Sequence, residues 1–406
     1  MITRRNLFEA AGGLVALAGA GSRAWAKEEP FLSPLLPAGT RAEAVLDALP
    51  GKKPLIKLAY RPPNYETPLT DLLTPITPND AFFVRYHLAD IPSIRAEDWR
   101  LSLGGPGANG ELELGLAELK ELPAFEIAAV CQCSGYRRGL FEPHVAGVQW
   151  GHGAMGCARW KGARLKDVLD LVGLKKDAVE ITFGGADGPV LDTTPDLVKS
   201  LPLWKAAEDT TLVAYEMNGE PLPQWNGFPA RIVVPGWTAT YWIKHVTRIA
   251  AVTEPFDGYW MKTAYRIPIG KFPLVKRFVS QETAVSAPIT EILVNSLITS
   301  PNDGTSVKAG RPLTVQGMAW DGGYGITSVE LSSDNGGSWV RARLGEDFGN
   351  FAFRPWSHAF IATARGKLSI KVRATNRFGQ TQPDELIENP AGYYHNKVQT
   401  LTLDAI

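Results

Sequence analysis

From residue 289 onward, short strand-like runs alternate with clusters of turn-forming residues, and this spacing constrains the fold more than any other feature of the sequence. Such a pattern is typical of two-sheet, all-β sandwiches. The segment 334–337, Asp-Asn-Gly-Gly, favours a hairpin turn between two of the strands. The expected strands are 313–315, 328–332, 339–344, 358–361, 368–375 and 398–403. Residues 286–406 are therefore predicted to form an immunoglobulin-like domain with a structural role.

The preceding residues, 27–285, mix helical and strand-like segments without a regular β-α-β alternation, which indicates an α+β domain. Apolar spacing predicts a helix over 165–172, and 115–122 is a second expected helix. Strands are expected at 80–88, 99–103, 125–130, 179–183, 212–216 and 232–234. The proline-rich stretch 27–75 is interpreted as an extended arm with one short helix at 41–49. A chain of 406 residues is long enough for two such domains.

The first 26 residues have the features of a twin-arginine export signal. Arg4 and Arg5 precede a weakly apolar stretch, 7–21, and Ala24-Trp-Ala26 supplies a cleavage site. The stretch is too short and too rich in glycine for a membrane-spanning helix, which needs about 20 apolar residues. A periplasmic protein beginning at Lys27 is expected, without stable membrane insertion. The formal net charge of +0 gives no indication of nucleic-acid binding.

The segment 131–138, Cys-Gln-Cys-Ser-Gly-Tyr-Arg-Arg, is the main candidate for chemistry. It follows an apolar run and turns at Ser134-Gly135 before two arginines. Positive neighbours favour a thiolate, and a thiolate is a soft metal ligand; the alternative is a buried structural cysteine. The three cysteines of the chain form neither a C-x-x-C nor a C-x-x-C-H motif, which argues against a thioredoxin-type pair and against a c-type haem in this chain. The six histidines show no standard zinc spacing.

Six motifs are spread over nearly all of the mature chain: Phe83-Val-Arg-Tyr-His87, Cys131-Gln-Cys-Ser-Gly-Tyr-Arg-Arg138, Ala158-Arg-Trp-Lys-Gly-Ala-Arg-Leu165, Tyr215-Glu-Met-Asn-Gly-Glu-Pro-Leu222, Gly227-Phe-Pro-Ala-Arg-Ile-Val-Val-Pro-Gly236 and Asn389-Pro-Ala-Gly-Tyr393. In this order they resemble the sulfite oxidase family of molybdenum enzymes, especially bacterial periplasmic sulfite dehydrogenases of the sulfite:cytochrome c oxidoreductase type. The resemblance implies a sulfite oxidase fold with a molybdopterin-binding domain and a C-terminal domain of the dimerisation type.

The resemblance also implies a cofactor, molybdenum bound to one pyranopterin, with Cys133 as the metal ligand. Cys131 and Cys157 are then packing residues. The resemblance places the cofactor against a set of residues drawn from five segments: Phe83, Arg85, His87, Asp187, Asn226, Arg231 and Lys244. The family usually has histidine at the position of Asn226.

Three residues are expected at the reacting centre by the same resemblance. Arg85 and Arg138 match the arginines of the anion pocket, and Tyr265 matches the active-site tyrosine, with Tyr241 as the alternative. From the residues alone, Arg85 could also be a salt-bridged core arginine. His87 could equally be a strand histidine and Tyr265 an ordinary buried aromatic.

The expected function is oxidation of sulfite to sulfate, with electron transfer to a c-type cytochrome. A haem-bearing domain is not expected in this chain, and a homodimer through the C-terminal domain is possible. Two alternatives keep the scaffold and change the reaction, namely a sulfane dehydrogenase and a sulfoxide reductase. A third alternative is a secreted, non-catalytic adhesion protein. The sequence does not identify the electron acceptor or the oligomeric state.

Overall fold

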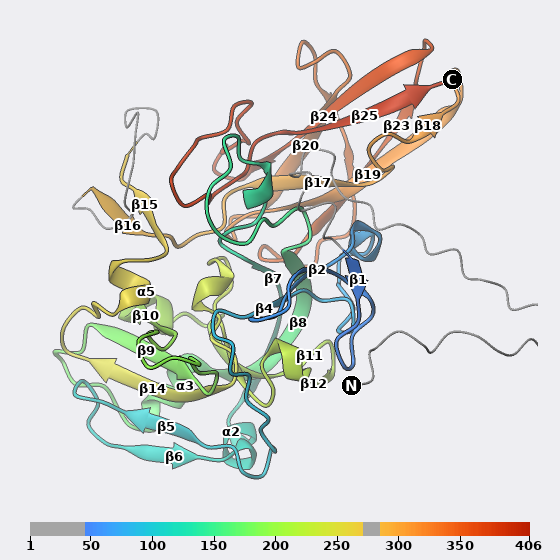
Figure 1. Ribbon diagram of the computed structural model, residues 1–406. Helices are drawn as coiled ribbons and strands as arrows, with labels where there is room; N and C mark the ends of the chain where they lie inside the picture. Colours follow the sequence, from blue (N-terminus) through green and yellow to red (C-terminus); the bar gives the residue numbers. More distant parts are fainter. Residues whose placement is uncertain (1–44, 271–284) are drawn as a thin grey trace, which may run out of the picture.

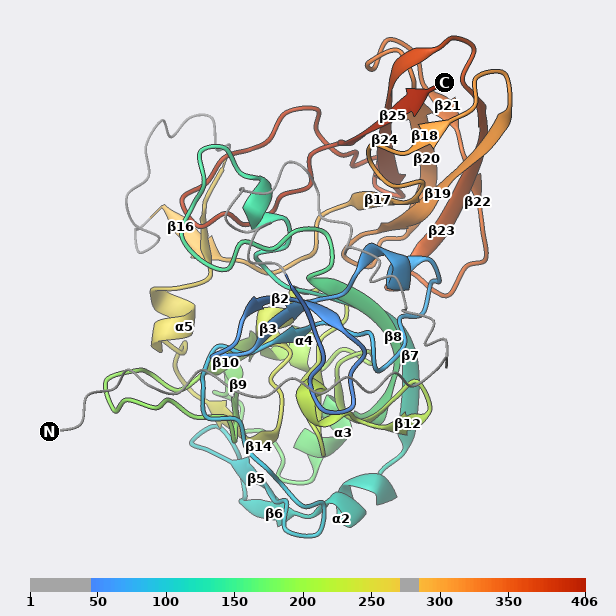
Figure 2. The same ribbon diagram turned by 45° about the vertical axis from the view of Figure 1, so that its right-hand side comes forward.

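The computed structural model describes residues 45–270 and 285–406, which form two parts joined by an extensive contact (Figure 1). The first part contains three sheets and short helices. The second, coloured orange to red, contains two sheets and is seen as a separate lobe in the rotated view (Figure 2). The predicted signal, 1–26, and the first residues of the predicted arm lie outside the described residues.

The described portion of the predicted arm forms part of a small antiparallel sheet. Its order is β1-β2-β3-β4, with the strands Val45–Asp47, Leu55–Ala59, Asn64–Glu66 and Val84–Arg85. The helix predicted at 41–49 is wrong in its described portion, because Val45–Asp47 pairs as a strand with residues 55–57. The strand predicted at 80–88 is reduced to its centre, Val84–Arg85, whose pairing with β3 brings Arg85 next to Asn64.

The two larger sheets of the first domain provide the framework of its core. One has the order β10-β9-β14-β5-β6, and in it β14 and β5 run parallel. These strands are Val198–Pro202, Glu180–Gly185, Val246–Val252, Leu101–Gly104 and Leu112–Leu114. The other has the order β12-β11-β8-β7, with β13 paired to β11. Its strands are Glu220–Pro221, Leu212–Met217, Met155–Arg164, Ala124–Gln132 and Arg231–Val233.

Helices are short in the described part of the first domain, so strands dominate it. The two predicted helices are present as α2 (Leu116–Glu121) and α3 (Leu165–Asp170); the second ends two residues before the predicted end. Leu165, Val168 and Leu169 are buried, as the apolar spacing requires. The remaining helical elements are α4 (Leu203–Ala206), α5 (Tyr259–Lys262), η1 (Leu69–Leu72), η2 (Arg138–Leu140), η3 (Gln224–Asn226) and η4 (Ala239–Tyr241). No described helix is long and apolar enough to cross a membrane.

The second domain consists of two sheets that share one core, in which Val315, Val329 and Val372 are fully buried. The first sheet is β17-β19-β23-β22: Asn295–Ser300, Pro312–Trp320, Arg354–Ile361 and Arg343–Leu344. The second is β18-β25-β24-β20-β21: Ser306–Val307, Gln399–Ala405, Gly366–Asn376, Ile326–Ser332 and Val340–Arg341. The single strand predicted at 339–344 divides between the two sheets. The immunoglobulin-like topology stays a prediction.

The two domains are also connected by a linking pair of strands, β15 (Arg266–Pro268) and β16 (Ser286–Pro288). The largest hydrophobic core extends from the first domain into the second, where it includes Met318, Trp320 and Phe353. The Trp320 indole donates a hydrogen bond of 2.6 Å to the Gln132 side chain at the end of β7. The second domain therefore supports the strand end that immediately precedes Cys133.

Candidate active site

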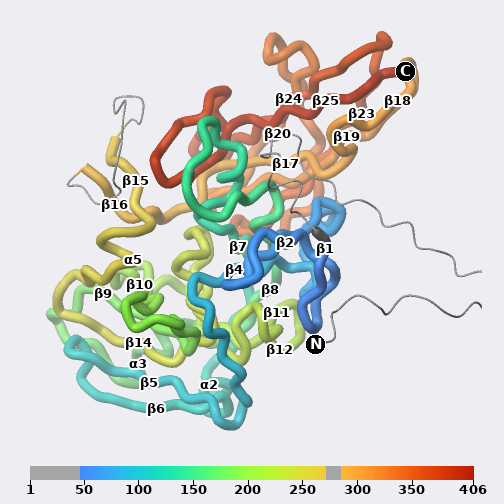
Figure 3. The backbone as a smooth tube through the Cα atoms, in the orientation of Figure 1, coloured from blue at the N-terminus to red at the C-terminus, as the bar shows by residue number. Residues whose placement is uncertain are grey.

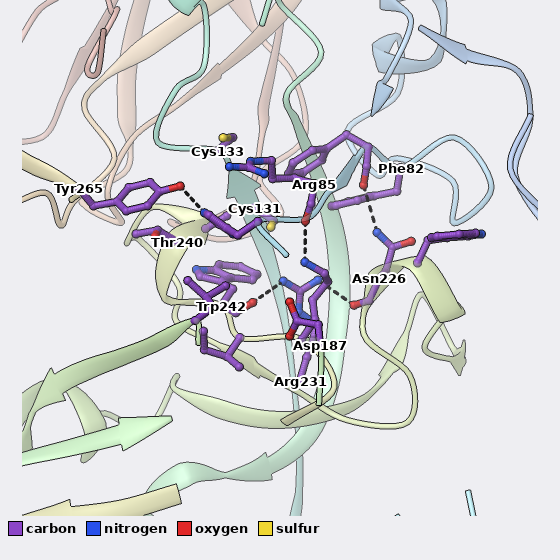
Figure 4. Close-up of a pocket in the computed structure, with 17 residues that line it drawn as sticks. Phe82, Arg85, Cys131, Cys133, Asp187, Asn226, Arg231, Thr240, Trp242 and Tyr265 are labelled. Carbon is purple, nitrogen blue, oxygen red and sulfur yellow. Dashed lines mark hydrogen bonds between the residues drawn. The ribbon is translucent and has the colours of Figure 1, made fainter. Parts of the chain in front are cut away.

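A cavity in the first domain gathers residues from distant parts of the chain (Figure 4). Nine of the ten candidate residues line it, and only Arg138 does not. The nine are Phe83, Arg85, His87, Cys133, Asp187, Asn226, Arg231, Lys244 and Tyr265. The wall is completed by Phe82, Cys131, Leu197, Trp225, Ala239, Thr240, Trp242 and Ile243. Folding thus brings together residues that are up to 182 positions apart, from Phe83 to Tyr265.

Cys133 follows directly after β7, where the chain leaves the sheet. Its backbone N–H donates to the Ala154 carbonyl (2.9 Å), which fixes the turn. Cys131 lies two residues earlier and also lines the cavity, whereas Cys157 does not. Burial raises the pKa of the Cys131 thiol to about 11 and that of Cys157 to about 12, so both are neutral thiols in this structure. All three cysteines are free.

His87 and Tyr265 form a hydrogen-bonded pair at one side of the cavity, through His87 Nε2 and the Tyr265 hydroxyl (Figure 4). Burial, and then the Arg85 charge, hold the pKa of His87 well below its usual value, so the imidazole is neutral. Burial also raises the pKa of Tyr265, which keeps its proton. The alternative, Tyr241, donates instead to the Ile289 carbonyl (2.7 Å) and is not part of the lining. The geometry therefore favours Tyr265 over Tyr241.

Arg85 has no ion pair among the described residues. Its guanidinium donates to the Asn64 side chain (3.1 Å) and to the Tyr86 carbonyl, both of which are neutral. The interpretation as a salt-bridged core arginine is therefore wrong for the described part of the chain. An arginine that is oriented by neutral acceptors retains its full charge for a ligand.

Arg138 lies behind the cavity wall. Its Nε donates to the Ala391 carbonyl (3.0 Å), and its guanidinium lies over the Tyr393 ring, 5.2 Å from the centroid. Tyr393 in turn stacks on Tyr265. Arg138 is thus connected to the site through two tyrosine rings, although no atom of it contributes to the mapped lining.

Two further cations line the cavity, the buried Arg231 and the half-buried Lys244. Lys244 Nζ donates to the Arg85 carbonyl (2.6 Å), and Arg231 donates to the carbonyls of Asn226 and Trp242 (2.9 and 3.0 Å). Burial lowers the pKa of Lys244 to about 7, with a further lowering by Arg231. These bonds, drawn as dashed lines in Figure 4, direct the two basic side chains to one region.

The side chains of this cavity fit an anionic, phosphate-bearing pterin. Asp187 is the only carboxylate among the lining residues, against Arg85, Arg231 and Lys244. Buried polar atoms also lack partners in the described structure, and they can bond to the edges of a heterocycle: His87 Nδ1, Asp187 Oδ2, Arg231 Nε and Thr240 Oγ1. Among the described residues, no three His, Cys, Asp or Glu side chains are placed to hold a metal ion together. The ligand set that the resemblance implies requires only one thiolate from the protein.

The sequence analysis missed two buried lysines near this cavity. Lys52, from the predicted arm, donates to the Asn226 side chain (2.5 Å), and burial lowers its pKa to about 7. Lys199 lies over the Tyr265 ring, 5.3 Å from the centroid, and donates to the Trp260 carbonyl (2.6 Å). A lone lysine in the apolar run 197–201 was a usable signal for Lys199. The Gly-Lys-Lys-Pro context of Lys52 offered none.

Comparison with known protein families gives two matches. The model for the oxidoreductase molybdopterin binding domain matches residues 87–260, and the model for the Mo-co oxidoreductase dimerisation domain matches residues 286–402. The chain thus contains a molybdopterin-binding oxidoreductase domain followed by a Mo-co oxidoreductase dimerisation domain.

Comparison with individual proteins specifies the family. The chain is 36% identical to human mitochondrial sulfite oxidase over 351 residues, which cover 82% of this chain and 63% of the human protein. It is 32% identical to the sulfite oxidases of Gallus gallus and Arabidopsis thaliana, of which it covers 78% and 79%. The chain belongs to the sulfite oxidase family. It spans about 62% of the rat protein and 63% of the human protein.

A solved structure shows the same fold. The sulfane dehydrogenase SoxCD from Paracoccus pantotrophus aligns with a TM-score of 0.73 over 95% of this chain and 93% of that chain, at 22% sequence identity. The similarity therefore covers both domains and their arrangement.

Proposed function

We propose that this protein oxidises sulfite to sulfate in the periplasm and transfers the electrons to a c-type cytochrome. The observation that carries the proposal is the excess of cationic groups over carboxylates in the cavity that Cys133 and Tyr265 line: Arg85, Arg231 and Lys244 against Asp187. A small oxyanion has little apolar surface, so its binding depends on charge-assisted hydrogen bonds. Arg85 offers such donors at the cavity, and Arg138 lies one side chain behind it.

Each residue has a defined part in this proposal. Cys133 would hold the metal, while Lys244, Arg231, Asp187 and Asn226 would hold the pterin. When bound, the molybdenum cofactor supplies the two-electron chemistry that side chains cannot provide. Arg85 binds and orients the substrate anion. Tyr265 keeps its proton and can donate a hydrogen bond, while the neutral His87 fixes the orientation of the hydroxyl.

Two measurements on the purified protein test the proposal. We expect about one molybdenum atom per chain, and sulfite-dependent reduction of added cytochrome c without haem absorbance from the chain itself. Absence of molybdenum would favour the non-catalytic, adhesive alternative. Turnover of sulfane sulfur or of sulfoxides, but not of sulfite, would assign the scaffold to one of the other two reactions.

Export and assembly are separate parts of the proposal. The twin arginines and Ala26 support cleavage before Lys27, and N-terminal sequencing of the exported protein tests this; a retained Met1 would contradict it. The match of residues 286–402 to a dimerisation domain supports a homodimer, which sedimentation equilibrium measures directly.

A further inference from the structure

The second domain contributes a loop to the neighbourhood of the site. Residues 389–393, which form one of the six motifs and have no role assigned above, lie beside the loop that follows Cys133 (Figure 3). The Ala391 carbonyl accepts the hydrogen bond from Arg138 Nε (3.0 Å). The Asn389 side chain stabilises the loop by bonding both the carbonyl (2.7 Å) and the N–H (3.0 Å) of Tyr393. The position of Tyr393 is therefore well defined.

The ring of Tyr393 lies between two candidate catalytic residues. It stacks on Tyr265, with centroids 5.6 Å apart and planes inclined by 14°. The Arg138 guanidinium lies over the Tyr393 ring, 5.2 Å from its centroid. A ring with these neighbours belongs to the same local structure as the proposed anion pocket.

The hydroxyl of Tyr393 has no hydrogen-bond partner among the described residues, although only 5% of the residue is exposed. This hydroxyl is not among the buried polar atoms that lack a partner, so it is accessible and can donate a hydrogen bond to a ligand that approaches it. The next residue provides a direct contrast, because the Tyr394 hydroxyl accepts a hydrogen bond from the Thr290 N–H (3.1 Å). Of these two adjacent tyrosines, only Tyr394 has a hydroxyl that is hydrogen-bonded to another described residue.

The electrostatic neighbours of the Tyr393 hydroxyl are those of the site. Burial raises the pKa of Tyr393, and Tyr265 and Cys133 raise it further, while Arg138 and Arg85 act in the opposite direction. Tyr393 therefore keeps its proton and is a hydrogen-bond donor. The surrounding arginines make this region favourable for an anion.

We propose that Tyr393 is a substrate-binding residue whose hydroxyl donates a hydrogen bond to the sulfur oxyanion held by Arg85. This inference rests on the proposed function for the identity of the substrate, and on the structure for the position of the residue. It means that the second domain takes part in substrate recognition as well as in support of the fold.

The test compares Tyr393→Phe with Tyr394→Phe in the molybdenum-loaded protein. Removing the Tyr393 hydroxyl should raise KM for sulfite about tenfold, or about 1.4 kcal/mol, with kcat within twofold and an unchanged melting temperature. Removing the Tyr394 hydroxyl should lower the melting temperature, because a backbone N–H loses its acceptor, and should leave KM unchanged. An equal rise of KM in both variants, or a wild-type KM in Tyr393→Phe, would overturn the proposal.

A second readout does not depend on turnover. Sulfate should raise the melting temperature of the wild-type protein and of Tyr394→Phe, and the rise should be smaller in Tyr393→Phe. If the wild-type protein shows this sulfate effect but does not oxidise sulfite, the proposed function fails and the role of Tyr393 in oxyanion binding stands. An identical sulfate effect in all three proteins would contradict that role.

Discussion

The cationic side chains of the second domain and those around the cavity of the first domain are in opposite environments. In the second domain no described lysine or arginine is buried, and three have a carboxylate partner: Arg354 with Asp347 (2.7 Å), Arg373 with Glu330 (3.0 Å) and Lys367 with Asp404 (2.7 Å). Around the cavity of the first domain, Lys199 and Arg231 are buried and Lys244 is half-buried, and no ion pair is found for any of them in the described ranges. Their hydrogen bonds go to backbone carbonyls instead.

The difference shows which region is built around a ligand. Burying a cation without a counter-ion is costly, and burial lowers the pKa of Lys52, Lys199 and Lys244 to about 7. An anionic cofactor and an anionic substrate would supply the missing negative charge. In the second domain the charges are already balanced, which fits its role as a scaffold. Tyr393 is the proposed exception, where the scaffold reaches the site.

The largest effect is expected at Cys133, the proposed protein ligand of the metal. Cys133→Ser should leave the fold intact and abolish turnover, because a hydroxyl is a poor donor to a soft metal centre. Cys157→Ser is the matched control at a buried cysteine that does not line the cavity, and it should retain most of its activity. Cys131→Ser, whose thiol does line the cavity, should also retain activity. Steady-state kinetics that found Cys131→Ser inactive and Cys133→Ser active would reverse the assignment.

The two arginines of the proposed anion pocket should give the next largest effect. Truncating one partner of a buried charge interaction costs roughly 2–5 kcal/mol, so Arg85→Ala or Arg138→Ala should lower kcat/KM by roughly 30-fold or more. Lysine at either position should restore only part of this, because an ammonium cannot reproduce the planar guanidinium. Sulfite kinetics are measured together with molybdenum content, which should not change. A fully loaded Ala variant with wild-type kcat/KM would show that the arginine is structural.

A pair of arginines, one in each region, sharpens the comparison directly. Arg231 and Arg373 both lie over tryptophan rings, Trp160 at 5.1 Å and Trp339 at 3.9 Å, but only Arg373 has a carboxylate partner. Arg231→Met should reduce bound molybdenum and pterin, since a hydrogen bond to a charged group contributes about 1.5–3 kcal/mol, or roughly 10- to 150-fold in affinity. Arg373→Met should keep full loading. Equal molybdenum and pterin content in the two variants would show that Arg231 does not hold the cofactor, and the contrast between the two regions would fail.

The smallest effect is a dependence of stability on pH. The pKa of Lys52, Lys199 and Lys244 is lowered from 10.5 to about 7 in the folded protein. Between pH 7 and pH 10 the unfolded chain therefore binds more protons, and the stability of the cofactor-free protein should rise with pH. Burial raises the pKa of Glu66 from 4.5 to about 7, and this carboxyl acts in the opposite direction below pH 7.

Melting temperatures of the cofactor-free and loaded proteins, measured from pH 7 to pH 10, test this. A bound anion restores the lysine pKa values toward 10.5, so the loaded protein should show a weaker rise. Parallel curves for the two forms would mean that these lysines do not face the cofactor.

Much of the site could be predicted, because short sequence motifs carry several of its residues. Cys133, Arg85 and His87 lie in compact motifs, where the order of residues along a strand or turn determines which side chains share a face. The other candidates came from the resemblance to the sulfite oxidase family that these motifs carry, and nine of the ten line one cavity. Several strand-forming regions were not recognised. Residues 45–47 were expected to be helical, and the long strand Met155–Arg164 was not among the expected strands, because pairing partners far away in the sequence decide both.

By itself, the sequence determined the succession of the domains, the resemblance to the sulfite oxidase family and the motif that carries Cys133. Only the tertiary structure decided that Tyr265 and not Tyr241 faces the cavity, that Lys52 and Lys199 reach its surroundings, and that Tyr393 lies between Arg138 and Tyr265. The physical reason is that burial and pairing depend on contacts across more than a hundred residues. No local sequence pattern shows whether a lysine is exposed to solvent or whether a tyrosine hydroxyl has a hydrogen-bond partner.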